Sequence, residues 1–277
     1  MRVLVLGATG RLGQMLQWGW QHESRLTPVW HGRTATDRRG WRRFDITQEP
    51  DALHDACREV DVVLCLAGIT PASGASLDLN TELALAASAA AGQTPLLIAS
   101  SAAVFGRAGH CKEDDAPQPV APYGMAKLAM ETAVEAAATG PVTCLRIGNV
   151  AGADQILGRA GIGQALTLDQ FADGRTPARS YIGPATLAKV LVTLCRAAGD
   201  GLPSVLNVAA PGMVEMGELL DAIPYPWQPR PAPVGAIAEV LLDTDRLSRF
   251  MRLDPTAGCA ENLIKEWRAF RAETDSE

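Results

Sequence analysis

The 277-residue sequence predicts an α/β fold, with a parallel, doubly wound sheet followed by a smaller C-terminal lobe. Short apolar runs of strand length alternate with helical patterns through about residue 150. A glycine-rich turn follows the first of these runs directly. Beyond residue 150 the alternation stops and Gly- and Pro-rich stretches become frequent. We therefore divide the chain into residues 1–150 and 151–277.

Apolar runs in the first part are the expected strands. They cover residues 2–6, 26–31, 61–66, 96–99 and 142–147. The runs at 2–6, 61–66 and 96–99 are rich in Val, Leu and Ile, which is typical of strands that are buried on both faces. A helix over 184–197 and a strand over 204–208 are expected to return to this part. The prolines between 224 and 233 predict a stiff, extended connector, and a helix is expected at the C-terminus.

The composition excludes several classes of protein. Hydrophobic residues are 47% and charged residues 20%, which indicates a globular chain. The net charge of −6 argues against a general binder of nucleic acids or acidic membranes. The six cysteines form no C-x-x-C pair, and Cys65 and Cys144 lie in apolar runs, so we expect reduced thiols in a cytoplasm. The four histidines show no metal-ligand spacing, so no metal is expected.

No segment of the sequence is expected to enter a membrane. The N-terminus opens directly into a strand, without a signal segment. Residues 83–105 carry no formal charge over a membrane-spanning length. However, Gly-Gln-Thr-Pro at 92–95 interrupts this stretch, which favours a buried helix followed by a buried strand.

The glycine-rich turn is Gly7-Ala8-Thr9-Gly10-Arg11-Leu12-Gly13, between the strand at 2–6 and a helical pattern. Glycines let a turn tighten and let backbone N–H groups approach a diphosphate at the start of the helix. The spacing is G-x-x-G-x-x-G, which differs from the commonest dinucleotide fingerprint. We predict dinucleotide binding here, and the alternative is an ordinary turn between a strand and a helix.

The end of the second strand indicates which dinucleotide is preferred. An acid that bonds the ribose 2′-hydroxyl marks NAD, yet His31, Gly32 and Arg33 include none. Residues 31–43 instead hold five arginines against one aspartate: Arg33, Arg38, Arg39, Arg42 and Arg43 against Asp37. An arginine can bind a 2′-phosphate in a bidentate way. We therefore predict NADP with Arg33 as its contact, and the alternative is a solvated basic loop. Asp45 could accept from an adenine amino group.

Tyr123 and Lys127 are four residues apart, so on a helix their Cβ atoms would lie about 5–6 Å from each other. A nearby ammonium favours the phenolate and suits the phenol to proton transfer. Pro122 is well placed to start this helix. Ser100 and Ser101 end the strand at 96–99 and add hydroxyls at the same sheet edge. The alternative is a surface tyrosine above a solvated lysine.

Several motifs agree in order and spacing with one family. They are GATGRLG at 7–13, FDI at 44–46, LAG at 66–68, Asn80, SSAAVFG at 100–106, YGMAK at 123–127 and LRIGNVAG at 145–152. RSYI at 179–182 and LNVAAPGMVEMGEL at 206–219 match more loosely. The chain resembles the extended short-chain dehydrogenases/reductases, the NAD(P)-dependent sugar epimerase/dehydratase/reductase group. The resemblance covers nearly the whole chain and implies a Rossmann-type sheet with a small substrate-binding lobe.

The resemblance implies roles for individual residues. Tyr123 would be the catalytic acid/base, Lys127 would lower its pKa and bond the nicotinamide ribose, and Ser101 would orient the substrate oxygen. Asn80 would support the active-site helix and a water. The cofactor-binding residues would be Gly7, Thr9, Gly10, Arg11, Leu12, Gly13, Arg33, Asp45, Ile46, Leu66, Ala67 and Gly68, with Tyr123 and Lys127. Substrate contacts would be Ser101, Asn149 and Arg179. Arg179 would meet a diphosphate, and the alternative is a surface arginine or an ion pair.

Departures from the family pattern narrow the activity. Ala102 and Ala103 replace the Asp-Glu pair of the sugar dehydratases and cannot move a proton, which argues against dehydration. An epimerase or oxidoreductase acting on a nucleotide-linked sugar is therefore expected. The alternatives are an NADPH-dependent reductase of a small non-sugar carbonyl compound and a non-catalytic dinucleotide sensor.

The resemblance also implies a homodimer, formed by packing helices that include the one bearing Tyr123. Small or adaptable residues on this helix suit such packing: Ala126, Ala129, Met130 and Ala133. The alternative is that these residues face the protein's own sheet.

Overall fold

A seven-stranded sheet in the order β12-β7-β5-β4-β1-β2-β3 is the centre of the computed structural model, which describes residues 1–34, 39–106, 109–159 and 166–274. Its strands are β1 (Arg2–Leu6), β2 (Thr27–Gly32), β3 (Trp41–Arg43), β4 (Val62–Cys65), β5 (Leu96–Ser101), β7 (Val142–Ile147) and β12 (Val205–Val208). β1 pairs in parallel with β2 and β4, and parallel pairing continues to β3 and β5. The predicted doubly wound sheet is confirmed. The chain order reverses between β1 and β4, where such sheets bind ligands.

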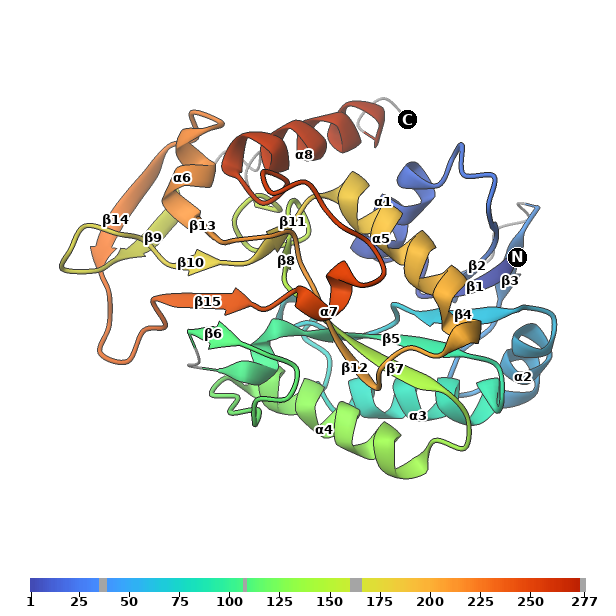
Figure 1. Cartoon of the computed structure of the whole chain (residues 1–277). Helices are drawn as coiled ribbons and strands as arrows, with labels where there is room; N and C mark the ends of the chain where they lie inside the picture. The colour runs from blue at the N-terminus through green and yellow to red at the C-terminus, as the bar shows by residue number, and fades with distance from the viewer. Residues whose placement is uncertain (35–38, 107–108, 160–165, 275–277) are drawn as a thin grey trace. The chain divides into compact units, whose positions relative to one another are not determined.

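Helices cover both faces of this sheet. They are α1 (Arg11–Gly19), α2 (Pro50–Arg58), α3 (Leu79–Ala91), α4 (Pro122–Ala137) and α5 (Pro184–Ala197). In Figure 1, α3 and α4 lie side by side on one face, and α1 and α5 on the other. Leu4 and Leu6 of β1 pack in one core cluster with Met130 of α4. Val3 and Val5, on the opposite face of β1, are also fully buried, so this strand is apolar and buried from Val3 to Leu6.

The described chain divides into two compact units. The first comprises Met1–Val104, Pro119–Arg146 and Ala188–Leu206, and the second comprises Phe105–Gln118, Ile147–Leu187 and Asn207–Glu277. The predicted helix at 184–197 and strand at 204–208 therefore contribute most of their residues to the first unit. The division differs from the expected boundary at residue 150 because it assigns Phe105–Gln118 to the second unit.

The second unit is built from short strands and helices. The strands are β6 (His110–Cys111), β8 (Asn149–Val150), β9 (Leu166–Gln170), β10 (Ala178–Arg179), β11 (Tyr181–Ile182), β13 (Val214–Glu215), β14 (Trp227–Pro231) and β15 (Glu239–Leu242). The helices are α6 (Met216–Asp221), α7 (Asp245–Ser248) and α8 (Ala260–Thr274), and short 3₁₀ helices cover Pro71–Ser73, Ala102–Phe105 and Ala198–Asp200 elsewhere in the chain. Tyr181 and Leu219 pack with Leu263 and Trp267 of α8 in its core.

The proline-rich stretch was predicted as a connector, but part of it is a strand. β14 pairs in parallel with β9, from Trp227 opposite Leu166 to Pro231 opposite Gln170. Successive N–H groups of a strand point to opposite sides. Pro229 and Pro231 therefore remove donors from one side only, and a strand with one free edge tolerates this.

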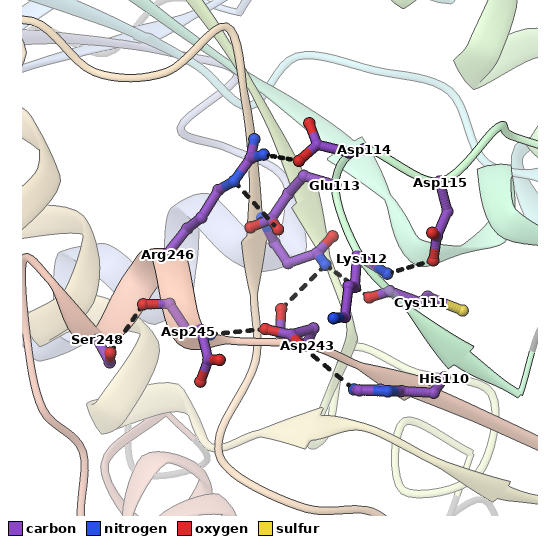
Figure 2. Close-up of polar contacts among 11 residues, drawn as sticks. His110, Cys111, Lys112, Glu113, Asp114, Asp115, Asp243, Asp245, Arg246 and Ser248 are labelled. Carbon is purple, nitrogen blue, oxygen red and sulfur yellow. Dashed lines mark hydrogen bonds and ion pairs between the residues drawn. The ribbon is translucent and has the colours of Figure 1, made fainter.

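A polar network holds the segment 110–115 in the second unit (Figure 2). Asn207 donates from its backbone N–H to Glu113 Oε1 at 3.0 Å. Its Nδ2 donates at 3.0 Å to the carbonyls of Cys111 and Asp243. Arg246 of α7 forms ion pairs with Glu113 and Asp114. The network thus ties β6 and its following loop to β12, β15 and α7.

The uncharged stretch 83–105 folds as most of α3, followed by β5 and a 3₁₀ turn. β5 is buried along most of its length within the sheet. Within the described ranges, no helix has both the length and the apolar character needed to span a bilayer.

Candidate functional site

The glycine-rich turn lies at the switch point of the sheet, between the end of β1 and the start of α1. Gly7 has φ +81°, and a Cβ there would lie 2.6 Å from the backbone nitrogen of Ala67, so only glycine fits. Gly10 is the N-cap of α1, and the first turn of α1 contains no acidic residue. Thr9, Gly10 and Arg11 are exposed, whereas Gly7 and Leu12 are half-buried and Gly13 is buried. An exposed helix N-terminus with this close backbone approach suits the phosphates of a dinucleotide.

His31 at the end of β2 is a residue whose role the sequence did not reveal. Its ring is buried, and burial lowers its pKa. Nδ1 lies 3.3 Å from the backbone nitrogen of Gly7, and Nε2 lies 2.9 Å from the carbonyl oxygen of Phe44. A neutral ring protonated on Nε2 satisfies both contacts, because Gly7 donates and Phe44 accepts. His31 therefore connects the glycine-rich turn to the segment after β3. The sequence could have indicated this role only through the expectation that β1 and β2 are neighbours in the sheet.

The basic segment after β2 is exposed where the structure describes it. Arg33, Arg39 and Arg43 are exposed, and Arg42 pairs with Glu59 at 2.7 Å. Asp37 and Arg38, which belong to the predicted basic loop, lie outside the described residues. Arg33 thus presents its guanidinium to solvent beside the end of β2.

Asp45 shapes the turn after β3. Its Oδ1 accepts hydrogen bonds from the Thr47 hydroxyl and from the N–H groups of Thr47 and Gln48. These bonds, those from Thr47 first, lower the pKa of Asp45. Ile46 is buried in the core on that side of the sheet. The local bonds of Asp45 give it a structural role, and its predicted contact with adenine stays a prediction.

The loop after β4 brings three predicted residues together. A Cβ on Gly68 would lie 3.0 Å from Asn80 Oδ1 and 3.3 Å from Lys127 Nζ, so these groups are neighbours. Leu66 and Ala67, just before it, are half-buried.

The Asn80 side chain holds this loop through hydrogen bonds. Its Oδ1 accepts from the Ile69 N–H at 3.1 Å, and its Nδ2 donates to the carbonyls of Ile69 and Leu77 at 3.1 and 2.9 Å. These hydrogen bonds hold the loop that follows β4. Support of the active-site helix and of a water by Asn80 stays a prediction.

Ser101 and Tyr123 meet across the start of α4. Ser101 is the last residue of β5, and Tyr123 lies in the first turn of α4, which begins at Pro122 as predicted. The two side chains are hydrogen-bonded to each other. A Cβ on Gly124 would lie 2.3 Å from the Ala103 carbonyl oxygen, so glycine at this position permits the close approach. The sequence placed Gly124 in the motif without indicating this packing role.

Burial is the main influence on the pKa of Tyr123 and raises it, while the hydrogen bond with Ser101 opposes this shift. Burial and Ser101 are the influences on this pKa, and the predicted lowering of it by Lys127 stays a prediction. Lys127 Nζ donates to the Ala99 carbonyl at 2.9 Å. Burial lowers the pKa of Lys127 to about 8, because it disfavours the charged form. Near neutral pH most of the Lys127 side chains still carry a proton.

The two substrate-contact residues predicted in the second unit make internal contacts. Arg179 donates from Nη1 and Nη2 to the carbonyls of Ala178, Ala238 and Ile237, at 2.7, 3.2 and 2.9 Å. Its half-buried guanidinium therefore holds β10 beside the segment before β15, and its expected contact with a diphosphate stays a prediction. Asn149 is hydrogen-bonded to the buried Tyr181 phenol, which also donates to Asp154 Oδ2 at 2.9 Å.

A groove of about 710 Å³ lies in the second unit. It is lined by Gln170, Phe171, Ala172, Pro229, Arg230, Pro231, Ala232, Pro233, Gly235 and Ala236. Arg230 pairs with Asp169 at 2.6 Å and is largely exposed. Sequence reasoning passed over this arginine because the surrounding prolines indicated only a connector. Among the described residues, no group of His, Cys, Asp or Glu side chains could hold a metal ion.

Solved structures share this fold over nearly their whole length. MoeE5 in complex with UDP-glucose and NAD is 22% identical, with a TM-score of 0.80 over 99% of this chain and 100% of that one. A UDP-glucose 4-epimerase from Stenotrophomonas maltophila, bound to NAD and formylated UDP-arabinopyranose, is 20% identical, with a TM-score of 0.79 over 100% of both chains. TunA, an NAD-dependent NDP-hexosamine 5,6-dehydratase of tunicamycin biosynthesis, is 19% identical, with a TM-score of 0.73 over 97% and 98%. At these identities the similarity establishes the fold.

The family is established by the sequence itself. No curated protein matches the chain. The model of the NAD dependent epimerase/dehydratase family matches residues 3–181, which is more than half of the chain. This match includes the glycine-rich turn, Ser101, Tyr123 and Lys127, and it confirms the resemblance inferred from the motifs. The chain belongs to the NAD dependent epimerase/dehydratase family.

Proposed function

We propose that this protein is an NAD(P)-dependent epimerase or oxidoreductase that acts on a nucleotide-linked sugar. The observation that carries the proposal is the hydrogen bond between Ser101, at the end of β5, and Tyr123 of α4. The same helix bears the buried Lys127. Family membership supports dinucleotide chemistry at this place. The UDP-sugars bound by MoeE5 and by the Stenotrophomonas epimerase support a nucleotide-linked substrate.

In the proposed reaction, Tyr123 moves the proton of a sugar hydroxyl and Ser101 orients that oxygen. The bound nicotinamide would accept and return a hydride at the same carbon. The ammonium of Lys127 favours the phenolate form of Tyr123 when the phenol gives up its proton. The glycine-rich turn and the N-terminus of α1 would hold the diphosphate of the cofactor. The second unit is the proposed substrate lobe, and its groove offers the Arg230 guanidinium to an anionic group.

Tyr123→Phe tests this proposal. The variant keeps the ring but removes the proton that moves, so turnover of UDP-sugars should fall by about 100-fold or more while coenzyme binding is retained. Turnover is measured by product analysis on a panel of UDP-sugars, and coenzyme binding by titration calorimetry. A Tyr123→Phe variant with full activity would refute the assignment.

The same panel separates the alternatives. Stoichiometric consumption of NADPH with small carbonyl compounds would identify a reductase, whereas turnover without net coenzyme consumption identifies an epimerase. Coenzyme binding without turnover on any substrate would favour a sensor. We propose that dehydration is absent, since Ala102 and Ala103 offer no acid or base. Detection of a dehydrated sugar would contradict this.

NADP rather than NAD is the coenzyme we propose, with a homodimer as the functional assembly. Arg33 is exposed at the end of β2, where no acid is available for a ribose 2′-hydroxyl. On α4, Ala129 is exposed and Ala126 and Ala133 are half-buried. Met130, also named as a packing residue, is instead buried in the protein's own core.

A further inference from the structure

Glu131 lies on α4 one helical turn after Lys127, and its carboxylate is the centre of a buried polar network. Oε1 accepts a 2.5 Å hydrogen bond from the Ser100 hydroxyl of β5. Arg146 of β7 donates from Nη2 to Oε2 at 2.8 Å and from Nε to both carboxylate oxygens at 3.2 Å. The exposed fractions of Ser100, Glu131 and Arg146 are 5%, 6% and 4%. The carboxylate is therefore enclosed, and both its oxygens are bonded.

The network joins the elements that carry the proposed chemistry. Ser100 directly precedes Ser101 on β5, and Glu131 is on the same helix as Tyr123 and Lys127. A buried ion pair is a poor source of net stability, because removing two charges from water costs about as much as their attraction returns. Its geometry, however, is strict, so it favours one register of α4 against β5. That register also decides whether the Tyr123 phenol meets the Ser101 hydroxyl.

The network also affects the charge on Lys127. Burial lowers the pKa of Lys127, and the Glu131 carboxylate opposes that shift. Cys65 of β4 and Cys144 of β7 also face Lys127, but burial raises the pKa of these thiols to about 11 and about 12. Both thiols are therefore neutral at the pH where Lys127 titrates. The Glu131 carboxylate is thus a negative charge on the same helix that favours the protonated form of Lys127.

We propose that Ser100, Glu131 and Arg146 form a positioning network that holds the Tyr123–Lys127 helix against Ser101. The inference rests on the proposed function of that pair. Neither Ser100 nor Glu131 is assigned contact with a substrate or a cofactor. Their effect on the reaction passes through the placement of Tyr123 and the charge of Lys127.

Glu131→Gln is the test, because it keeps the shape of the side chain and removes its charge. We expect kcat to fall by about 10- to 100-fold, as for a displaced catalytic group, with KM and the coenzyme Kd nearly unchanged. Loss of the carboxylate removes a negative charge that favours protonated Lys127, so the pKa of Lys127 should fall. The alkaline limb of the pH–kcat profile should then move to lower pH. Titration of ¹³Cε-labelled lysine by NMR, with Lys127 assigned from a Lys127→Arg variant, measures this shift without any substrate.

Glu135→Gln is the matched control, since it removes an exposed carboxylate one turn further along α4. It should leave kcat and the Lys127 titration as in the wild type. If Glu131→Gln fails to fold, Ser100→Ala removes only the hydroxyl and should lower kcat without moving KM. A folded Glu131→Gln that matches Glu135→Gln in kcat and in the Lys127 titration overturns the proposal. Full activity of Tyr123→Phe, by contrast, would remove the proposed function, and the lysine titration would still report on the network.

Discussion

At the smallest scale, we propose that the choice of coenzyme depends on Arg33. It follows the end of β2 directly, its side chain is exposed, and neither His31 nor Gly32 offers a carboxylate to a 2′-hydroxyl. His31 is instead occupied by Gly7 and Phe44. An unhindered guanidinium at this position can bind a phosphate through two parallel hydrogen bonds.

Arg33→Ala should therefore weaken NADP binding by about 10- to 100-fold, the loss of a charge-assisted hydrogen bond, and leave NAD binding unchanged. Titration of both coenzymes by calorimetry measures the difference. Arg39→Ala removes an equal charge from the same segment and should change neither affinity by more than about 3-fold. Tighter binding of NAD than of NADP by the wild type would exclude the predicted preference.

The start of α4 is the decisive element, because it carries Tyr123 to Ser101. Pro122 suits the first helical position, and Gly124 lets the backbone approach the Ala103 carbonyl. Alanine has the higher intrinsic helix propensity, by about 1 kcal/mol, so sequence reasoning alone would call Gly124→Ala favourable. The 2.3 Å separation predicts the opposite, because the carbonyl belongs to rigid backbone and cannot move aside cheaply.

Gly124→Ala should lower the free energy of unfolding by about 1–3 kcal/mol through overpacking. It should also move Tyr123 away from Ser101 and reduce kcat by about 10- to 100-fold. Denaturant unfolding and steady-state kinetics measure the two effects. Met125→Ala, at a neighbouring position that is 52% exposed, should change neither. A Gly124→Ala variant of wild-type stability and kcat would show that the close approach is unimportant.

At the scale of the whole molecule, the exposed face of α4 is the basis for the proposed homodimer. Ala129 is exposed there and Ala126 and Ala133 are half-buried, while Met130 and Val134 pack into the protein's own core. Small exposed side chains permit the close approach of a second helix. Light scattering should give twice the chain mass of 29.3 kDa. Ala129→Glu should return the protein to a single-chain mass, and a wild type of 29.3 kDa at micromolar concentration would exclude the dimer.

Much of the first unit could be predicted from the sequence. The strand at 142–147 and the helix at 184–197 have the predicted bounds. Their apolar residues are flanked by Gly and Pro, and such local patterns determine where an element begins and ends. The second unit was predicted less well. β9 and β14 are far apart in the sequence and rich in polar residues and proline, so their pairing left no periodic signal.

The sequence by itself determined most of the order of strands and helices in the first unit, the glycine-rich turn, and the side chains that we propose for proton transfer. These follow from local composition and short spacings, which act within one element. Only the tertiary structure decided which partners those side chains meet. In that structure Arg179 is hydrogen-bonded to backbone carbonyls, and His31 is hydrogen-bonded to the turn at Gly7. Glu131 is hydrogen-bonded to Ser100 and Arg146. The physical reason is that burial and hydrogen bonding of polar groups depend on residues far away in the chain, which no local pattern records.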